Sequence, residues 1–439
     1  MSSTLAPSTP DRRPFAAMLT AQTVSNAGTV MTFLAVPWFV LQTTGSAGRA
    51  GAAAFAEGVA FAVSAAFAGL IVDRVGARRT SIASDLVAGL AIAGVPVLHL
   101  TIGLQFWQLL VLVAVAALVR APGDTAREVL LPDLAERGAV GLERAVSLAD
   151  GVARAARLLG GPAAGVLIAT LGPADVLLVD AGTFIFSAVL FGAYVPRGAR
   201  MVDDEAPGTH WLADLREGLG FLVHQPLLRA VVLMVLVTNA LDAANGSVLQ
   251  PVYARQVLHS SVGLGLMTAV FGGGAVVGAL AYSAVGHRLP RRWLYTVAFL
   301  VVGGPRFALL AATDRLWLVL VGYALIGVLC GAINPILSSV TYELVPVALR
   351  GRVLGAISAG CYAAIPLGAA VTGWLVEQTG LRASLVTVGV AYLAVTLSPV
   401  LGRVWRQLDD QRGADGASAP DATGRPVSPA GETLTRLPD

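Results

Sequence analysis

Twelve apolar runs of about 20 residues dominate this chain, and few charged side chains interrupt them. An α-helix rises 1.5 Å per residue, so each run is long enough to cross a hydrocarbon core about 30 Å thick. Charged residues make up 13% of the 439 residues, and the mean hydropathy is +0.73. Soluble proteins carry about 25% charged residues and need polar faces on their helices. The sequence therefore predicts an all-α membrane protein with twelve transmembrane helices.

The apolar runs fall into two sets of six. The first set lies near residues 15–41, 50–72, 80–101, 106–125, 149–171 and 174–195. The second set lies near residues 229–252, 262–284, 293–312, 316–340, 353–377 and 383–404. We therefore predict an N-terminal six-helix bundle over residues 15–195 and a C-terminal six-helix bundle over residues 229–404.

The segments outside the two bundles are polar. Residues 196–228 are predicted to form a cytoplasmic linker, with a short amphipathic helix around residues 212–222 that lies on the membrane. Residues 1–14 are predicted to be a cytoplasmic N-terminus. Residues 405–439 are rich in Pro, Gly, Ala, Asp and Thr, so we expect a disordered cytoplasmic tail with little to bury.

The distribution of arginine predicts how the chain is oriented. An even number of crossings places both ends of the chain on one side, and most of the 30 basic residues lie in segments on that side. The loops on the other side hold only Arg49, Arg255, Arg315 and Arg382. Because cytoplasmic loops are enriched in basic residues, both termini are predicted to be cytoplasmic. Because the basic residues are concentrated on one side of the predicted membrane, we attribute the net charge of +3 to orientation in the membrane rather than to nucleic-acid binding.

The two halves of the chain repeat each other at an offset of 208 residues. The matched pairs are Arg144 with Arg352, Gly165 with Gly373, Leu167 with Leu375, and Gly172 with Gly380. Parallel repeats of six helices, related by an axis along the membrane normal, build the two bundles of one class of transporters. The repeat therefore predicts two pseudo-symmetric bundles.

One short loop has an unusual pattern of glycine, acid and arginine. The segment from Gly69 to Arg79 reads Gly-Leu-Ile-Val-Asp-Arg-Val-Gly-Ala-Arg-Arg, so a helix is expected to leave the bilayer at Asp73 and Arg74. Glycine permits a tight turn, and arginine is retained on the cytoplasmic side. The residues in these two roles are Gly76 for the turn, and Arg78 and Arg79 for the cytoplasmic face.

The spacing Gly-x3-Asp-Arg-x-Gly-x-Arg-Arg resembles the signature loop of the major facilitator superfamily, between its second and third helices. The resemblance covers residues 15–404 and implies the major facilitator fold. In the second half of the chain, Tyr282 stands in place of the acid. The resemblance also implies that Asp73 acts as a conformational lock. It would meet the start of the eleventh helix, around 352–355, and pair with Arg120 or Arg127 when the cytoplasmic side is closed.

Other stretches resemble the drug:proton antiporter branch, which includes macrolide-efflux and siderophore-export proteins. They begin at Ala126, Leu158, Leu249 and Glu343. The second of them contains Gly161-Pro162-x2-Gly165 and is similar to the fifth-helix motif of antiporters, with Arg157 at the place of an upstream glycine. Proline lacks an N–H and bends a helix, and small residues let helices approach closely. This motif indicates either a bend at a moving interface or plain helix packing.

Ionisable and amide groups within the spans are candidates for a transport site. A charged group in hydrocarbon is costly unless it is paired or hydrated, so each one is a functional candidate. A buried carboxylate can take up a proton on one side and release it on the other. We assign that role to Glu57 and Asp242, with structural pairing as the alternative. The other candidates for the coupling site or the substrate cavity are Arg306, Asp180, Asn26, Gln22, Asn239 and Asn245.

No motif in the sequence indicates ATP or metal chemistry. Gly272 to Gly274 lack the lysine and hydroxyl of a phosphate-binding loop and lie inside an apolar run. Cys330, Cys361 and the five histidines have no metal-ligand spacing or nucleophile motif, which argues against an enzyme. We therefore expect no cofactor and no metal, and a transport reaction driven by an ion gradient.

The sequence predicts a secondary transporter in the cell membrane that exports hydrophobic drugs or natural products, with proton antiport as the expected mechanism. The expected partners are the lipid bilayer, a small lipophilic substrate and protons, with no nucleic acid and no obligate protein partner. A dedicated siderophore or secondary-metabolite exporter would use the same motifs. A non-transporting scaffold or sensor is the alternative from another class. The buried acids and the Gly69–Arg79 loop argue against it.

Overall fold

The computed structural model describes residues 11–196, 211–286, 291–346, 349–401 and 405. Six long helices form the N-terminal bundle. They are α1 (Arg13–Thr44), α2 (Ala47–Val75), α3 (Ala77–Thr101), α4 (Phe106–Arg137), α5 (Leu142–Leu171) and α6 (Pro173–Tyr194). Helix α7 (Trp211–His224) stands where the sequence predicted an amphipathic helix in the linker.

Several spans of the C-terminal bundle consist of more than one helical segment. The seventh span is α8 (Pro226–Ala244), the π-helical turn η1 (Asn245–Leu249) and α9 (Gln250–Gln256), and the eighth is α10 (Ser261–Val285). The ninth comprises α11 (Arg291–Val302) and α12 (Gly304–Ala312), and the tenth α13 (Leu316–Cys330) and α14 (Ile333–Leu344). The last two are α15 (Arg350–Thr379) and α16 (Leu381–Thr396), followed by the short α17 (Ser398–Leu401).

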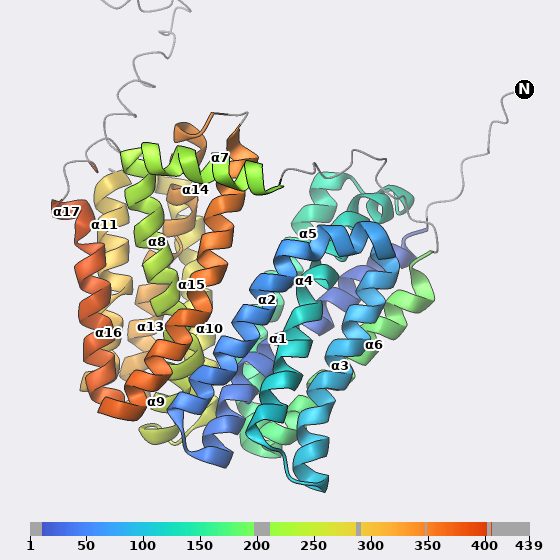
Figure 1. Cartoon of the computed structure of the whole chain (residues 1–439), viewed down its shortest axis with the longest axis horizontal. Helices are drawn as coiled ribbons and strands as arrows, with labels where there is room; N and C mark the ends of the chain where they lie inside the picture. The colour runs from blue at the N-terminus through green and yellow to red at the C-terminus, as the bar shows by residue number, and fades with distance from the viewer. Residues whose placement is uncertain (1–10, 197–210, 287–290, 347–348, 402–404, 406–439) are drawn as a thin grey trace, which may run out of the picture.

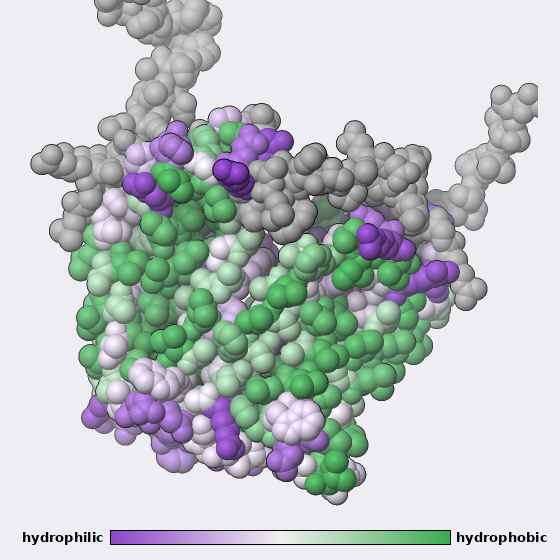
Figure 2. Space-filling model, viewed as in Figure 1, coloured by the Kyte–Doolittle hydropathy of each residue, from purple (hydrophilic) through white to green (hydrophobic). Residues whose placement is uncertain are grey.

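Eleven of these spans are long and apolar enough to cross a membrane, and Leu381–Thr396 is a shorter apolar helix that completes the predicted set of twelve. The described residues contain no β-strand. On the face shown in Figure 2, apolar residues cover the middle of the molecule and hydrophilic residues gather toward its two ends. This arrangement confirms the predicted all-α membrane fold.

The predicted repeat is visible in the helix boundaries. Helices α5 and α15 have 30 residues each, and both their first and their last residues are 208 positions apart. Each is followed by a glycine with positive φ, Gly172 at 90° and Gly380 at 80°, and the next helix begins directly after it. Glycine adopts positive φ without the penalty of a Cβ, which explains why both halves use it to reverse the chain.

Some boundaries differ from the prediction. The fourth apolar run ends near residue 125, whereas α4 continues to Arg137. Its last turns are polar, and an ion pair between Arg137 and Asp133, four residues apart, supports them. The predicted tail begins at 405, yet Trp405 is buried, with its ring centroid 6.1 Å from that of Tyr295. Residues 406–439, 197–210 and 287–290 lie outside the described residues, and so do parts of the predicted tail, linker and Gly286–Arg292 loop.

The two bundles meet at one end and separate toward the other (Figure 1). Helix α7 and the turn between α2 and α3 lie at the separated end, which we call the linker face. The turns after α1, α3 and α5 lie at the other end, which we call the opposite face. We call the linker face open because the helices of the two bundles spread apart there, and the opposite face closed because they meet there.

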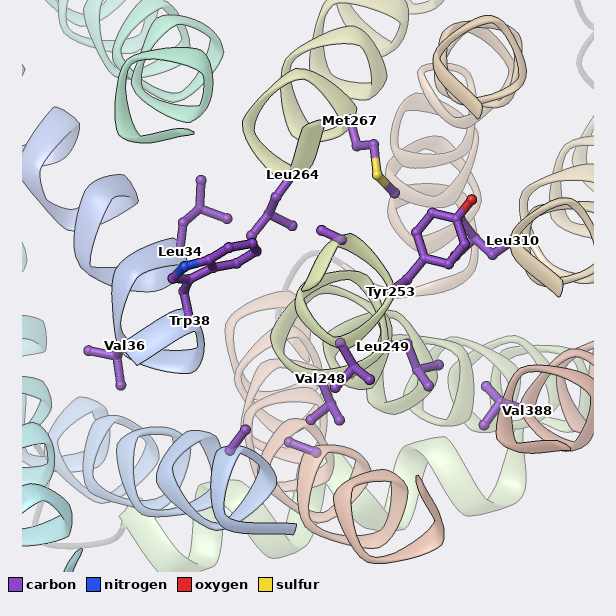
Figure 3. Close-up of a cluster of buried hydrophobic side chains, with 14 of the residues drawn as sticks. Leu34, Val36, Trp38, Val248, Leu249, Tyr253, Leu264, Met267, Leu310 and Val388 are labelled. Carbon is purple, nitrogen blue, oxygen red and sulfur yellow. The ribbon is translucent and has the colours of Figure 1, made fainter. Parts of the chain in front are cut away.

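The hydrophobic core shows the same division. One large cluster joins both bundles, and in Figure 3 Leu34 and Trp38 of α1 lie beside Leu264 of α10. Two smaller clusters are each confined to one bundle. One surrounds Phe15 and Leu134, and the other surrounds Leu222 and Val353 with α7. Because the core is shared near the opposite face alone, the bundles are held together at that end.

Glycine residues bring the bundles together at two crossings. At the α2–α15 crossing, a Cβ on Gly51 would lie 2.9 Å from the Cα of Gly373. At the α5–α10 crossing, a Cβ on Gly165 would lie 2.7 Å from the carbonyl oxygen of Ser261, whose hydroxyl donates a hydrogen bond of 3.0 Å to the Gly165 carbonyl. Any larger residue would push the helices apart at these points. Gly165 and Gly373 are a repeat-related pair, so the two crossings are pseudo-symmetric.

Candidate functional site

A cavity of about 690 Å³ lies between α1, α4 and α5 of the N-terminal bundle and reaches α10 of the other bundle. Two of the predicted residues, Gln22 and Asn26, line it from α1. Its charged lining comes from α4 and α5 and comprises the acids Asp124, Glu128 and Asp150 and the arginines Arg120, Arg127 and Arg157. The volume lies within the range of small-molecule sites, about 300–1,000 Å³. The cavity is therefore large enough for a drug-sized molecule and has a strongly polar wall.

The repeat-equivalent place in the C-terminal bundle has the opposite chemistry. A smaller pocket of about 120 Å³ lies between α8, α14 and α15. Leu354 and Ile357 line it at the positions that match Val146 and Ala149 of the large cavity. The remaining lining is Val232, Val235, Leu337, Ser338 and Thr341, so two hydroxyls are its only polar side chains among the described residues. At these two equivalent places, the N-terminal bundle thus offers charged side chains and the C-terminal bundle offers an apolar surface.

Glu57 lies in the first half of α2 and lines a cavity of about 30 Å³ with Thr29, Thr32 and Arg120. A space of this size holds one or two waters when polar groups surround it. Among the described residues Glu57 forms no hydrogen bond and no ion pair. Thr29 and Arg120 also line the large cavity, so polar groups connect Glu57 to it. Glu57 is therefore an acid beside a small polar cavity, with Arg120 nearby but no ion pair among the described residues.

Asp180 of α6 is fully buried in the N-terminal bundle beside this site. Its two carboxylate oxygens accept hydrogen bonds from the hydroxyls of Thr32 and Thr183, the latter at 3.0 Å. Thr32 also lines the cavity of Glu57, so the predicted candidates Asp180 and Glu57 are neighbours. The position of Asp180 links α6 to α1 and leaves it no direct access to the large cavity.

Arg127 of α4 is 4% exposed and forms an ion pair with Asp85 of α3, in which Nη2 of the guanidinium donates to both carboxylate oxygens at 2.6 and 2.7 Å. Ser81 and Ser187 surround the pair, and the Ser187 hydroxyl donates to Asp85 at 2.6 Å. The sequence suggested Asp73 as a partner of Arg127 when the cytoplasmic side is closed; in this conformation the partner of Arg127 is Asp85. The Asp85 carboxylate and the serine hydroxyls meet the hydrogen-bonding needs of a buried guanidinium, which an exposed acid at the end of α2 would not.

Arg120 lies on the same helix as Arg127. Because α4 runs on to Arg137, Arg120 lies near the middle of the helix rather than at its cytoplasmic end. Its guanidinium is 4.0 Å from Asp124 and 5.7 Å from the ring centroid of Phe61. In this conformation it is a neighbour of Glu57 and makes no ion pair with Asp73.

Arg306 and Asp242, predicted separately, form an ion pair in the C-terminal bundle. The arginine side chain is 4% exposed and the aspartate side chain 37% exposed. The guanidinium also lies over the rings of Phe307 and Tyr392, at 4.9 and 5.8 Å from their centroids. The pair is thus buried on its cationic side and accessible on its anionic side.

Asn239 and Asn245 flank this pair along the seventh span. Asn239 is half-buried on α8, and Asn245 is buried at the start of the π-helical turn η1. Within the described residues, the side-chain oxygen of Asn245 and Nε of Arg306 are buried and have no hydrogen-bond partner. Gln250 donates a hydrogen bond of 3.2 Å to the hydroxyl of Tyr323 one turn further on. π-helical turns inside α-helices are frequent at functional sites.

The segment from Gly69 to Arg79 forms the end of α2, a one-residue turn and the start of α3. Gly76 has φ of 89°, which only glycine adopts readily, so this residue makes the turn. Arg78 donates two hydrogen bonds of 2.6 Å to the carbonyls of Val195 and Gly192 at the end of α6. Asp73, Arg74 and Arg79 are exposed, and Asp73 has no hydrogen bond or ion pair within the described residues.

Gly161, Pro162 and Gly165 lie in α5, and the two glycines face α10. A Cβ on Gly161 would lie 3.1 Å from the carbonyl oxygen of Gly265. The motif is thus part of the α5–α10 crossing between the bundles. The close backbone contact accounts for its glycines, and its role as a bend stays a prediction.

Sequence reasoning did not select Asp85 as a site residue, and it did not select the tyrosines Tyr392 and Tyr323. Nothing in their local sequence distinguishes them from core tyrosines. The described residues contain no group of three or more His, Cys, Asp or Glu side chains placed to hold a metal ion.

A family profile and related sequences point to the same protein family. A sequence profile described as the Major Facilitator Superfamily matches residues 18–261 and 231–438. The multidrug efflux pump Tap of Mycolicibacterium fortuitum is 33% identical over 401 residues, which cover 91% of this chain and 98% of that protein. The protein of the same name from Mycobacterium tuberculosis (strain ATCC 25618 / H37Rv) is 32% identical over 402 residues, covering 91% and 96%.

Solved structures with the same fold are more distant in sequence. The nucleoside transporter NupG has a TM-score of 0.71 at 11% identity, covering 88% of this chain and 98% of that one. A bacterial homologue of the human lysosomal transporter Spinster, in an inward-facing and unoccupied conformation, has a TM-score of 0.68 at 14% identity. It covers 92% of this chain and 99% of that one. At these identities the likeness shows the fold alone.

Proposed function

The chain belongs to the major facilitator superfamily, and from this premise we propose that it exports hydrophobic drugs or natural products across the cell membrane in exchange for protons. The most similar sequences reported above are multidrug efflux pumps over nearly their whole length, which supports export of several compounds. The protein is a multi-pass membrane protein. We place its linker face and both termini in the cytoplasm, where export of a drug begins.

The cavity of about 690 Å³ carries the proposal. It lies in the half of the molecule where the bundles separate, so a compound can enter it from the linker face. Among the described residues, the lining acids Glu128 and Asp150 form no ion pair and suit a positively charged group, and the apolar pocket on α8, α14 and α15 suits the hydrophobic part of the same molecule. A lipophilic molecule with a cationic centre would therefore find both kinds of contact between the two bundles.

Glu57 is the acid best placed to carry the proton. It has no cationic partner that would hold it permanently ionised, and Thr29 and Arg120 connect its small cavity to the large one. A cation bound in the large cavity and a proton bound to Glu57 would then disfavour each other, because both add positive charge close to Arg120, which borders both cavities. Asp242 is the second candidate because its carboxylate is accessible, although Arg306 already neutralises it.

Asp73 completes the proposed cycle as a lock on the linker face. It is exposed in this conformation, in which the linker face is open. When that face closes, the end of α2 would approach the start of α15, and the carboxylate would meet the positive end of that helix. The lock would favour the outward-open state, and Tyr282 leaves the second half of the chain without an equivalent acid.

Transport can be tested by expressing the protein in a host that lacks its own efflux pumps. We expect lower accumulation of lipophilic drugs, and an uncoupler that collapses the proton gradient should abolish the difference. The panel should include siderophores, because their selective export would indicate a dedicated exporter instead. Unchanged accumulation of every compound would contradict the proposal.

The proposed orientation has its own test. A reporter enzyme that is active only in the cytoplasm, fused after Leu408, should be active. A fusion after Ile102, at the turn between α3 and α4 on the opposite face, should be inactive. The reverse pattern would place the termini outside the cell and overturn the orientation.

A further inference from the structure

The two bundles are joined on the opposite face by a carboxylate that sequence reasoning did not select. Glu377 lies near the end of α15, in the C-terminal bundle. Its Oε2 accepts a hydrogen bond of 2.9 Å from the hydroxyl of Ser46 and one of 2.8 Å from the backbone N–H of Gly48. Both donors belong to the start of α2 in the N-terminal bundle. These two contacts connect parts of the chain that move apart if the opposite face opens.

The start of α2 is well suited to hold this carboxylate. The Ser46 hydroxyl accepts a hydrogen bond of 3.1 Å from the N–H of Arg49, as an N-cap residue does, and donates its own proton to Glu377. The first backbone N–H groups of a helix lack partners within the helix and carry partial positive charge. Glu377 therefore satisfies groups that would otherwise need water.

We propose that Glu377 is a latch that holds the opposite face closed while the linker face is open. The latch belongs to the antiparallel pair of α2 and α15, which cross at Gly51 and Gly373. Opening the opposite face separates the start of α2 from the end of α15 and breaks both hydrogen bonds. Glu377 thus stabilises the inward-open state, whether or not the transported compound is a drug.

The helix pair of α2 and α15 has one acid on each face of the molecule, and each acid would stabilise the closed form of its own face. Asp73 lies at the end of α2, in the half where α15 begins, and Glu377 lies at the end of α15, where α2 begins. Each acid can reach the start of the other helix only when its own face is closed. The structure contains the contact of Glu377, and the contact of Asp73 belongs to the other state of the proposed cycle.

The pseudo-symmetric crossing of α5 and α10 lacks such a latch. The position that matches Glu377 at the offset of 208 is Ala169, near the end of α5. Ala169 lines an open cleft of about 530 Å³ together with Ser260, the N-cap residue of α10, and Ser261. A longer side chain at 169 therefore has room to reach the start of α10. The two repeat-related crossings can therefore be compared directly, because the position is Glu377 at the α2–α15 crossing and Ala169 at the α5–α10 crossing.

Distance measurements between spin labels test the latch in the full-length protein in lipid vesicles. Cys330 and Cys361 are first replaced by serine, and pairs of cysteines are then introduced at exposed sites. The pair for the opposite face is Ile102 with Asp314, and the pair for the linker face is Glu136 with Ser283. Each pair places one label on each bundle.

We expect Glu377→Ala to increase the population with long distances on the opposite face at least twofold and to shorten the distances on the linker face. Gln378→Ala is the matched control, because Gln378 is exposed on the same turn and forms no hydrogen bond within the described residues. The latch is overturned if Glu377→Ala matches the control on either face. A change on the opposite face alone is one such result, because the bundles would then have loosened at that face without the coupled closure of the linker face.

A gain of function provides a second, independent test. Ala169→Glu should add a carboxylate at the start of α10 and reduce opening of the opposite face in the Glu377→Ala background. Ala169→Gln has nearly the same size without the charge and should restore closure less. Equal effects of the two variants would contradict an electrostatic latch. None of these measurements requires transport, so failure of the proposed drug export would leave their outcome intact.

Discussion

Each bundle contains one deeply buried arginine held by an aspartate, but the two pairs are built differently. Arg127 is enclosed by Asp85 and serine hydroxyls, and Asp85 is only 6% exposed. Arg306 is enclosed by aromatic rings, its Nε has no partner among the described residues, and Asp242 is 37% exposed. The Asp85–Arg127 pair is closed to solvent, whereas in the Asp242–Arg306 pair the carboxylate is exposed at the surface of the bundle.

This difference indicates that the two ion pairs have different roles, one in stability and one in transport. A buried pair with every polar atom satisfied resists change, because removing one partner leaves a charge that nothing compensates. An accessible carboxylate can be exchanged, hydrated or protonated without unpacking the bundle. We infer that Asp85 and Arg127 hold the N-terminal bundle rigid around its charged cavity. Asp242 and Arg306 can take part in the transport cycle.

The largest expected effect comes from breaking the closed pair. Asp85→Ala should lower the free energy of unfolding by about 3–5 kcal/mol, because it leaves Arg127 buried without its counter-charge. Asp124→Ala is the control on the same helix bundle. Its pair with Arg120 spans 4.0 Å and both side chains are more than 40% exposed, so we expect a loss below about 1 kcal/mol. Thermal unfolding of the purified proteins in detergent measures both, and similar midpoints would contradict the proposed difference in roles.

The next effect concerns coupling, and it compares the two candidate acids. Glu57→Gln and Asp242→Asn keep the size of each side chain but remove its ionisation, and both should abolish proton-driven exchange. Only Asp242→Asn should also lower the thermal stability, because only Asp242 neutralises a buried arginine. If both variants export like the wild type at every pH, another acid carries the proton or transport is uncoupled.

A smaller effect is expected from filling the apolar pocket of the C-terminal bundle. Ser338 is exposed at its edge, so Ser338→Leu should occupy the pocket without disturbing the core. Loss of contact with one apolar group of a substrate weakens binding by about 1.5–3 kcal/mol, so the KM for a lipophilic cation should rise about tenfold or more. Ser147→Leu, exposed on α5 outside both pockets, serves as the control. An unchanged KM in Ser338→Leu would exclude this pocket from substrate binding.

The smallest effect belongs to the lock at the end of α2. Asp73→Asn should leave protein levels and substrate binding near normal, yet shift the population toward the inward-open state. A carboxylate at a helix N-terminus contributes about 0.3–1 kcal/mol, which corresponds to a shift of about 2- to 5-fold. Labels at Glu136 and Ser283 on the linker face report it. An unchanged distance distribution in Asp73→Asn would rule out the lock.

The sequence was sufficient for the fold because bilayer thickness fixes the length of each apolar run. The length of the apolar run did not predict the end of α4, because polar residues continue the helix beyond that run up to Arg137. The offset of 208 holds to the residue between α5 and α15, because Gly172 and Gly380 end both helices by the same positive φ, although both helices begin earlier than the predicted runs 149–171 and 353–377.

The candidate site could be predicted only in part. Burial in an apolar run singled out Glu57, Asp180, Asp242 and Arg306 as individual residues, because charge is costly there whatever the fold. Their partners depend on which helices pack together, and a single sequence does not contain that information. Glu377 escaped notice because an exposed acid at the end of a span carries no such cost.

We propose above all that this chain exchanges a lipophilic cation for protons through Glu57. Purified protein in proteoliposomes with an acidic lumen, with the membrane potential clamped at zero, tests it most directly. The wild type should accumulate radiolabelled tetraphenylphosphonium against its concentration gradient while the lumen loses protons, and Glu57→Gln should do neither. Accumulation that is independent of the pH gradient, or equal in the wild type and Glu57→Gln, would contradict the account.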